Sequence, residues 1–377
     1  MKKPKMRLVA AAAVLASAGA AHAQSSVTMW GIVDLNVQHL NATGAGHMNA
    51  LGNGSLSTSQ LGFRGVEDLG GGLRAAFWLE SSLNPDTGTG RNSNTNNQPS
   101  GAVNSGGALT FDRRSYAALA GNWGEVRLGH DFVPTHYNNI AFDAFNANGL
   151  ARAGDFAFAG VTTGPMSTAI TASNAVSYWL PANLGGVYGM GMVALGENPS
   201  TAANHNDGNF ASARLGYATG PFDVAGGFSR TSYKATATLG DYTHANLGAS
   251  YNAGFAKFFA LYNDVKVDVT NGPVRKDSWV IGAHIPVGPG RLRLSYGHLN
   301  DRSGGSLLNA DGSGRSTNDA TLIGVGYVYE MSKRTALYAT YGRVSNKGQG
   351  AYLVSGGLTP DAGGSSSGIE AGIRHSF

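Results

Sequence analysis

The sequence has no cysteine, few charged residues and only one long apolar run, and each absence excludes a class of protein. Without cysteine, an exported chain cannot use a disulfide framework, a cysteine-based zinc site or thiol catalysis. Charged residues make up 13% of the chain, against roughly 25% in a typical soluble domain, yet mean hydropathy is slightly negative. Strands with one face toward lipid and one toward water would account for both properties. The 56 glycines have no triplet period, which excludes collagen.

The apolar run is predicted to be part of an export signal. It covers residues 8–20, follows a basic start and ends at Ala21-His22-Ala23, which fits the A-x-A cleavage rule. We therefore expect a signal peptide over residues 1–23 and a single mature domain over 24–377, beginning at Gln24. The run is too short for a spanning helix, which needs about 20 apolar residues. Cleavage would remove four basic residues and no acid, so the mature chain would be formally neutral. The basic charge of the precursor thus gives no support for nucleic-acid binding.

The C-terminal segment alternates strictly between apolar and polar residues up to the last position. Ile369, Ala371 and Ile373 occupy one phase, Glu370 and Arg374 the other, and the chain ends on an aromatic residue. A period of two predicts a strand with one apolar and one wet face. An exported chain built from such strands is typical of the bacterial outer membrane.

Similar alternation recurs along the mature chain and predicts sixteen strands joined by tight turns and long polar stretches. The predicted strands are 27–37, 60–66, 73–80, 111–120, 125–130, 175–180, 186–195, 210–217, 222–231, 243–251, 255–267, 278–285, 291–299, 320–329, 335–344 and 368–377. In hydrocarbon every backbone N–H and C=O must be paired, so the sheet must close on itself. The fold class is therefore all-β, a 16-stranded antiparallel transmembrane β-barrel with short periplasmic turns and long extracellular loops. A soluble β-core with aromatic edges is the alternative.

Eight long stretches lie between the strand pairs, roughly at 38–58, 81–109, 132–173, 197–208, 232–241, 269–276, 301–318 and 346–366. The longest, 132–173, is less polar than an exposed loop should be, because it contains Ile140, Phe142, Phe145 and Phe156. A structureless loop of this length is usually functional. We expect this third loop to fold into the barrel and narrow it; a surface loop that shields its own small cluster is the alternative.

Arginines occupy the water-facing phase of the predicted strands. Arg64, Arg74, Arg114 and Arg127 come from four neighbouring strands and are called here the arginine wall. Further arginines of this phase are Arg214, Arg293 and Arg374. A sixteen-stranded barrel is wide enough for water, so these charges should line a pore. The candidate acids are Asp131 at the start of the long loop and, within it, Asp143 and Asp155. The two loop acids should lie opposite the arginines and create a transverse field.

Several motifs together resemble the trimeric general porins of beta-proteobacteria, of the Neisseria, Comamonas, Bordetella and Burkholderia type. The matching stretches are 26–34, 62–72, 114–119, 128–131 with Pro134, 331–338 and 372–377. The resemblance spans the mature chain. It implies a homotrimer of sixteen-stranded barrels, an inward third loop, and outer-membrane assembly machinery that reads Phe377. His130 stands where the family usually has arginine, so a positive charge at that point would depend on pH.

The function expected is passive diffusion through a water-filled outer-membrane channel. Its partners would be ions and small hydrophilic solutes, outer-membrane lipid, other copies of the chain and the assembly machinery. No catalytic residue, metal-ligand set, cofactor or nucleic-acid partner is expected, because no motif with the necessary spacing occurs. We expect a slight preference for anions. The alternatives are a barrel that acts as an adhesin or surface hydrolase, and a secreted soluble β-protein.

Overall fold

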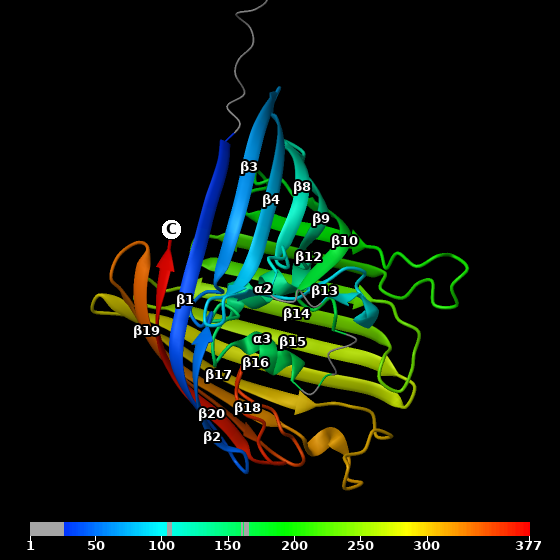
Figure 1. Cartoon of the computed structure of the whole chain (residues 1–377), viewed down its shortest axis with the longest axis vertical. Helices are drawn as coiled ribbons and strands as arrows, with labels where there is room; N and C mark the ends of the chain where they lie inside the picture. The colour runs from blue at the N-terminus through cyan, green and yellow to red at the C-terminus, as the bar shows by residue number, and fades with distance from the viewer. Residues whose placement is uncertain (1–25, 104–107, 160, 162–165) are drawn as a thin grey trace, which may run out of the picture.

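The chain folds into a closed ring of sixteen antiparallel strands, as predicted (Figure 1). The computed structural model describes residues 26–103, 108–159, 161 and 166–377, so the predicted signal peptide lies outside the described residues. The ring contains β1 (Ser26–Ala42), β2 (Gly46–Asn53) continued by β3 (Gln60–Gly70), β4 (Leu73–Asn84), β8 (Arg114–Gly121), β9 (Gly124–Phe132), β10 (Thr171–Trp179), β11 (Val187–Ala194), β12 (Phe210–Thr219), β13 (Phe222–Thr231), β14 (Asp241–Asn252), β15 (Lys257–Val269), β16 (Gly272–Val287), β17 (Gly290–Asp301), β18 (Ala320–Glu330), β19 (Thr335–Asn346) and β20 (Ser365–Ser376).

The first and last strands close the ring. β1 pairs with β20 from Ile32 opposite Ser376 to Ala42 opposite Ser366. The last residue, Phe377, donates a backbone hydrogen bond to the Gly31 carbonyl at 3.0 Å and accepts one from its N–H at 3.2 Å. The sheet therefore has no free edge at this seam, which is the condition for a strand structure in lipid.

Two of the predicted loops are wrong. Within 38–58, β1 continues to Ala42 and β2 returns from Gly46. Within 269–276, β15 and β16 are joined by a tight turn, with Val269 opposite Gly272. These hairpins have polar residues in both phases, because strands that continue beyond the lipid no longer need an apolar outer face. Periodicity therefore identifies the spanning part of a strand and misses its extension into water.

The outward face of the barrel is apolar and carries aromatic residues near the short turns. The exposed aromatic residues near these turns include Tyr217, Phe222, Tyr251, Phe255, Tyr329 and Phe377. Tyrosine and tryptophan favour the headgroup level, where ring and polar tip are both satisfied. In a water-soluble protein so much exposed apolar surface would be a liability.

The long loop does lie inside the ring, and it is not structureless. It contains helix α2 (Pro134–Phe142), which contacts β12 to β15, and helix α3 (Ala153–Phe158), which contacts β15 to β17 (Figure 1). We call residues 133–170 the inward loop. Smaller elements are β5 (Thr89–Gly90), β6 (Ser93–Asn94), η1 (Pro99–Gly101), β7 (Ala102–Val103) and η2 (Arg315–Thr317). Among the residues the structure describes, no helix has the length and hydropathy to cross a membrane.

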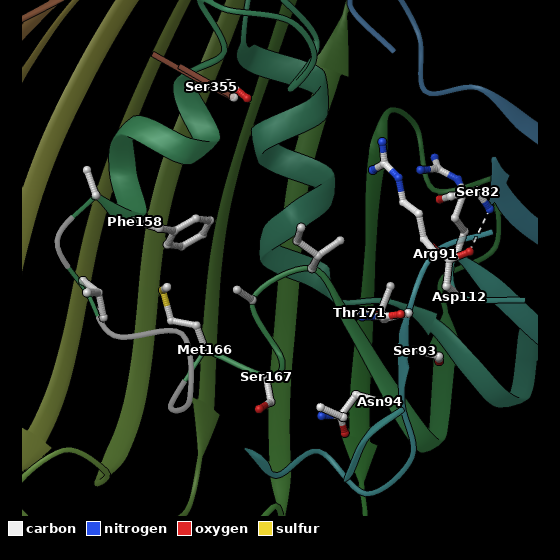
Figure 2. A pocket seen from close by; sticks show the side chains of 18 of the residues that line it. Ser82, Arg91, Ser93, Asn94, Asp112, Phe158, Met166, Ser167, Thr171 and Ser355 are labelled. Carbon is white, nitrogen blue, oxygen red and sulfur yellow. Dashed lines mark hydrogen bonds between the residues drawn. The ribbon is translucent and has the colours of Figure 1, made fainter. Parts of the chain in front are cut away.

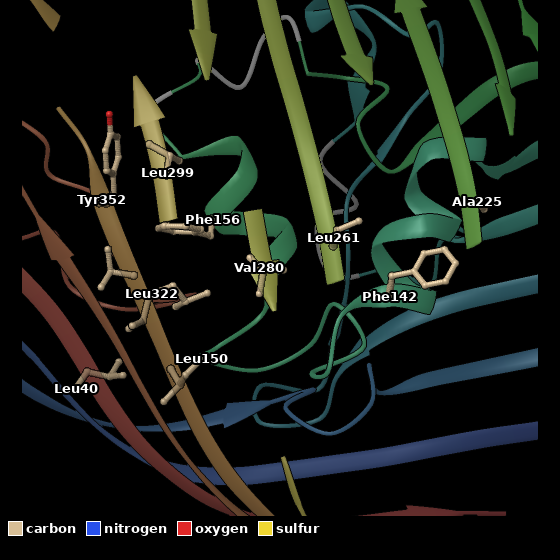
Figure 3. Packing of buried hydrophobic residues seen from close by; sticks show 14 residues of the cluster. Leu40, Phe142, Leu150, Phe156, Ala225, Leu261, Val280, Leu299, Leu322 and Tyr352 are labelled. Atoms are coloured by element: carbon tan, nitrogen blue, oxygen red, sulfur yellow. The ribbon is translucent and has the colours of Figure 1, made fainter. Parts of the chain in front are cut away.

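The inward loop packs on the inner wall through apolar side chains (Figure 3). Phe142, Leu150 and Phe156 of the loop form one buried cluster with wall residues such as Leu261 and Leu322. The inner face of this wall is therefore apolar as well, which explains why alternation breaks down around residues 255–264. Burial of this surface is the main force that holds the loop inside the barrel.

Glycines of the inner wall make room for the loop. A Cβ at Gly282 would lie 2.6 Å from the Cβ of Ala144, and one at Gly324 would lie 2.4 Å from the Cβ of Ala151. Real Cβ atoms do not approach this closely, so only glycine permits the contact at these positions. Glycine at these positions of the wall thus allows the loop to pack closely against the strands.

Candidate functional site

Two arginines of the predicted wall share a carboxylate. Arg127 in β9 places Nη1 2.8 Å from Asp131 Oδ2, and Nε 2.6 Å from Glu125 Oε1. Arg114 in β8 places Nε 3.5 Å from Asp131 Oδ1, and Nη1 3.7 Å from Glu80 Oε2. Asp131 thus holds two guanidinium groups side by side on neighbouring strands. Because arginine stays protonated, two positive charges are fixed at this place.

A third guanidinium, from Arg113, joins this group. Arg113 pairs with Glu80 through Nε, and its Cζ lies 5.0 Å from the centre of the Phe132 ring. Arg114 lies over the same ring at 4.8 Å. The predicted strand 111–120 included residue 113, but β8 begins only at Arg114, so strand alternation does not govern the position of Arg113. The adjacent arginines 113 and 114 were the available signal, and strand periodicity overlooked it.

The arginines of this group are more exposed than two of the three carboxylates they pair with. The Glu80 and Asp131 side chains are each 3% exposed, whereas those of Arg113, Arg114 and Arg127 are 20%, 19% and 14% exposed. Glu80 and Asp131 therefore lie behind the guanidinium groups, whereas Glu125, the other partner of Arg127, is 31% exposed. A solute beside Arg113 and Arg114 meets positive charge first, and beside Arg127 it also meets Glu125.

The other two members of the arginine wall lie on the adjoining strands. Arg64 in β3 lies over the Trp78 ring at 5.5 Å, and Arg114 lies over the same ring at 5.1 Å. Arg74 in β4 is opposite Ala120 in β8, and Arg127 in β9 is opposite Ala118 in β8. Arg74 therefore lies two residues nearer the short turn than Arg127. The four arginines thus come from consecutive strands. Arg64, Arg114 and Arg127 form the closer group.

Asp143 does not lie opposite the arginines, and that prediction is wrong. It is buried inside the inward loop, where its carboxylate accepts backbone N–H groups from Phe145 at 2.9 Å and from Ala147 and Ala153 at 3.0 Å. Burial raises the pKa of Asp143, and the three backbone donors oppose this effect. The residue organises the loop. Asp155 lies in α3, but its side chain is outside the described part of the chain.

The inward loop meets the arginine group through Tyr137 of α2. The Tyr137 hydroxyl lies 3.4 Å from Asp131 Oδ1 and 3.4 Å from Arg114 Nη2, and its ring meets Trp179 edge-on at 5.2 Å. Burial raises the pKa of Tyr137, so the hydroxyl stays neutral and can donate. The loop thus adds a neutral polar group beside the arginines.

A cavity of about 1070 Å³ lies beside the inward loop (Figure 2). Arg91 and Asp112 lie on one side, and Phe158 and Met166 on the other. Arg91 donates to the side chains of Asn84 and Asn53 at 3.1 and 3.2 Å, and burial lowers its pKa. Arg91 is a further cation that strand periodicity could not find, because it lies outside the predicted strands.

The tip of the inward loop is fixed by Glu370 in β20. The carboxylate accepts hydrogen bonds from Ser55 Oγ at 2.6 Å, Gln38 Nε2 at 3.3 Å and the Leu150 N–H at 3.4 Å. Ser55 belongs to residues 54–59, which connect β2 to β3. The loop is therefore tied to the seam of the barrel as well as to the wall.

His130 is buried, and its charge cannot serve a solute directly. Nδ1 lies 2.8 Å from Ser173 Oγ and Nε2 lies 2.8 Å from the Asp112 carbonyl oxygen. Both ring nitrogens therefore have partners within the fold. The related family usually has arginine at this position, whereas here the position has no exposed cation.

A match to known proteins decides the family. The model of the family described as Gram-negative porin matches residues 10–349. The chain belongs to the Gram-negative porin family. This porin is 36% identical, over the full length of both chains, to outer membrane porin protein 32 of Delftia acidovorans. It is 25% identical to major outer membrane protein P.IB of Neisseria meningitidis serogroup B, again over both full lengths.

Solved structures agree with this assignment. The porin superposes on the anion-selective porin from Comamonas acidovorans with a TM-score of 0.80 and 34% identity, covering 94% of this chain and 100% of that one. These relatives are channels and not enzymes. The protein is accordingly an outer-membrane porin, a multi-pass β-barrel that forms a water-filled channel for ions and small hydrophilic solutes.

Proposed function

We propose that this porin prefers anions, and that Arg113, Arg114 and Arg127 with Arg64 supply the preference. The observation that carries the proposal is that Arg113, Arg114 and Arg127 are more exposed than Glu80 and Asp131, which leaves Glu125, at 31% exposed, as the one exposed acid among the three carboxylates paired with them. The related porin from Comamonas acidovorans is named anion-selective, which agrees with this assignment. The buried position of Asp143 removes the loop acid that would have balanced the field.

The mechanism combines narrowing with electrostatic attraction. The inward loop occupies part of the cross-section and leaves the arginine group beside the path of solutes. A unit charge 4 Å away contributes about 1 kcal/mol in bulk water and about 4 kcal/mol where the effective dielectric constant is near 20. Partly buried arginines beside narrow water lie between these limits. We expect moderate selectivity, with cations still conducted and the preference reduced by salt.

Assembly follows from the same resemblance. We propose that residues 1–23 are removed on export, that three copies of the mature chain associate, and that the outer-membrane assembly machinery reads Phe377. The exposed ring of this terminal residue supports the last point. Conductance steps that occur in groups of three would test the trimer separately from selectivity.

Conductance in different salts tests the anion preference. Single-channel conductance of the purified porin should fall strongly when chloride is replaced by the slower acetate ion. It should fall little when potassium is replaced by lithium. The reverse pattern, with conductance following the cation, would reject the proposal.

A further inference from the structure

The inner face of the barrel carries aromatic rings among the residues of the arginine wall. Trp78 in β4 is opposite Arg64 in β3. Ser177, two residues before Trp179 in β10, is opposite Arg127 in β9. Strand alternation therefore places these rings on the same face as the arginines. Five rings from β1, β4, β8, β10 and β11 share this face, and we call them the aromatic band: Trp30, Trp78, Tyr116, Trp179 and Tyr188.

Rings and guanidinium groups alternate along this part of the wall. Arg127 lies between two rings, with its Cζ 4.6 Å from the centre of Tyr116 and 4.0 Å from that of Trp179. Trp78, which Arg64 and Arg114 both approach, meets Trp30 edge-on at 5.7 Å. A guanidinium group over an aromatic face is attracted by the quadrupole of the ring. The wall thus presents flat apolar groups directly beside fixed positive charges.

Two rings of the aromatic band cross onto the neighbouring strand at a glycine. A Cβ at Gly62 would lie 2.4 Å from Cε2 of Trp30, and one at Gly216 would lie 2.3 Å from Cζ of Tyr188. Glycine in a strand often marks a place where another group approaches the backbone closely. Each of these rings therefore lies over the backbone of the next strand, and the surface that remains uncovered faces the interior of the barrel.

Most of the aromatic band lies on the part of the wall beside the inward loop. The helices of the loop contact mainly β12 to β17, whereas four of the five rings come from β1, β4, β8 and β10. The three tryptophans and Tyr188 are half-buried, so part of each ring meets water in the channel. Apolar surface left in water is unfavourable. Glu80 and Asp131 already hold the neighbouring arginines, so fixing their position does not by itself require these rings.

We propose that the aromatic band and the arginine wall together bind aromatic carboxylates, so that benzoate-like anions are a solute class this porin favours. The carboxylate pairs with a guanidinium group, which accepts it in a bidentate manner. The ring of the solute stacks on an adjacent tryptophan, offset or edge-on. An aliphatic anion makes only the first of these contacts. The inference rests on the proposed anion preference and adds to it the chemical class of anion.

Block of the potassium chloride current by two matched anions tests the proposal on the purified porin in planar bilayers. The probes are benzoate and cyclohexanecarboxylate, which carry the same charge at neutral pH and are similar in size, but only benzoate has an aromatic face. The ratio of their dissociation constants therefore isolates the contribution of the ring. W78L/W179L removes two rings of the aromatic band, and W78F/W179F keeps a ring at both positions. W279L removes an exposed ring of the outer face and is the control.

The reversal potential across a potassium chloride gradient, measured on the same channels, reports the anion preference separately. Chloride has no ring, so a cation-selective wild type would refute the proposed function, whatever the ratio of the two carboxylates. Conduction of potassium chloride by W78L/W179L will show that this variant has folded.

A stacked aromatic pair contributes roughly fivefold to affinity beyond the burial of apolar area. Wild type, W279L and W78F/W179F should therefore bind benzoate about fivefold more tightly than cyclohexanecarboxylate. W78L/W179L should bind the two anions alike. Equal binding of both anions by wild type would overturn the proposal and would leave the rings only a structural role beside the arginines. A ratio that W78L/W179L retains would overturn it as well.

Discussion

Phe142 of the inward loop packs directly on Gly248 of β14, where a Cβ would lie 2.1 Å from the ring Cδ2. No side chain other than hydrogen fits beneath the ring without displacing it. Ala144 and Ala151 of the loop pack in the same way on Gly282 and Gly324 of the wall. The wall therefore determines the path of the inward loop, because the loop can pack closely only where the wall has glycine.

Gly248→Ala should push the inward loop off the wall without preventing barrel formation. Overpacking of this kind costs about 1–3 kcal/mol, enough to populate displaced loop positions. We expect a noisier channel with altered mean conductance in single-channel recordings. Gly226→Ala in β13 is the control, since its nearest non-neighbour atom to an added Cβ is 3.8 Å away. Identical recordings for both variants would show that Phe142 does not depend on this contact.

Asp143→Ala should loosen the inward loop from within. The substitution leaves the N–H groups of Phe145, Ala147 and Ala153 without their acceptor. Each unsatisfied buried group costs about 1–3 kcal/mol. Proteases should then cleave the loop of the folded porin at least several times faster than in wild type. Asp311→Ala, at an exposed acid of a surface loop, should leave cleavage of the inward loop unchanged. Wild-type resistance of the Asp143 variant would count against an organising role.

Acidification should weaken the packing of the inward loop through His136. Burial, together with nearby Arg113, lowers the pKa of His136 from 6.5 to about 3. A released loop binds a proton below pH 6.5 that the packed loop does not, so packing is strongest above that pH and is lost as pH falls toward 3. The slope approaches 1.4 kcal/mol per pH unit for one proton.

Channel noise measured from pH 7 to pH 4 should therefore rise on the acid side in wild type. The rise should be smaller in His136→Asn, which cannot titrate. His205→Asn, at an exposed histidine, should behave like wild type. If noise is flat with pH, or if His136→Asn follows wild type, another group controls the loop.

The sequence alone predicts the architecture well because lipid imposes strict rules. Alternation, the terminal Phe377 and the series of short turns together determine a closed ring of sixteen strands. The same rules cease to apply where the chain leaves lipid. The strand β2 and the extended hairpin between β15 and β16 were missed for that reason, since in water either phase can be polar.

The site was predicted less completely. Periodicity places Arg114 and Arg127 on the inner face, because both lie within strands. It could not place Arg91, which lies in a predicted loop, and it put Arg113 in the phase opposite to Arg114 because the predicted strand 111–120 began three residues before β8 does. Arg293 was expected to face water, yet it is buried and its Cζ lies 4.3 Å from the centre of the Phe145 ring. Only the folded position of the inward loop determines which inner side chains stay wet, and a loop path is a tertiary property.

The reversal potential across a potassium chloride gradient tests the central claim most directly. The account predicts an anion-selective potential for wild type, a shift toward cations in R114Q/R127Q, and no shift in R343Q, which removes an exposed arginine of the outer face. Neutralising two partly buried cations should change the permeability ratio by up to roughly 30-fold, since each contributes on the order of 1 kcal/mol at close range. A cation-selective wild type, or a reversal potential that R114Q/R127Q leaves unchanged, would contradict it.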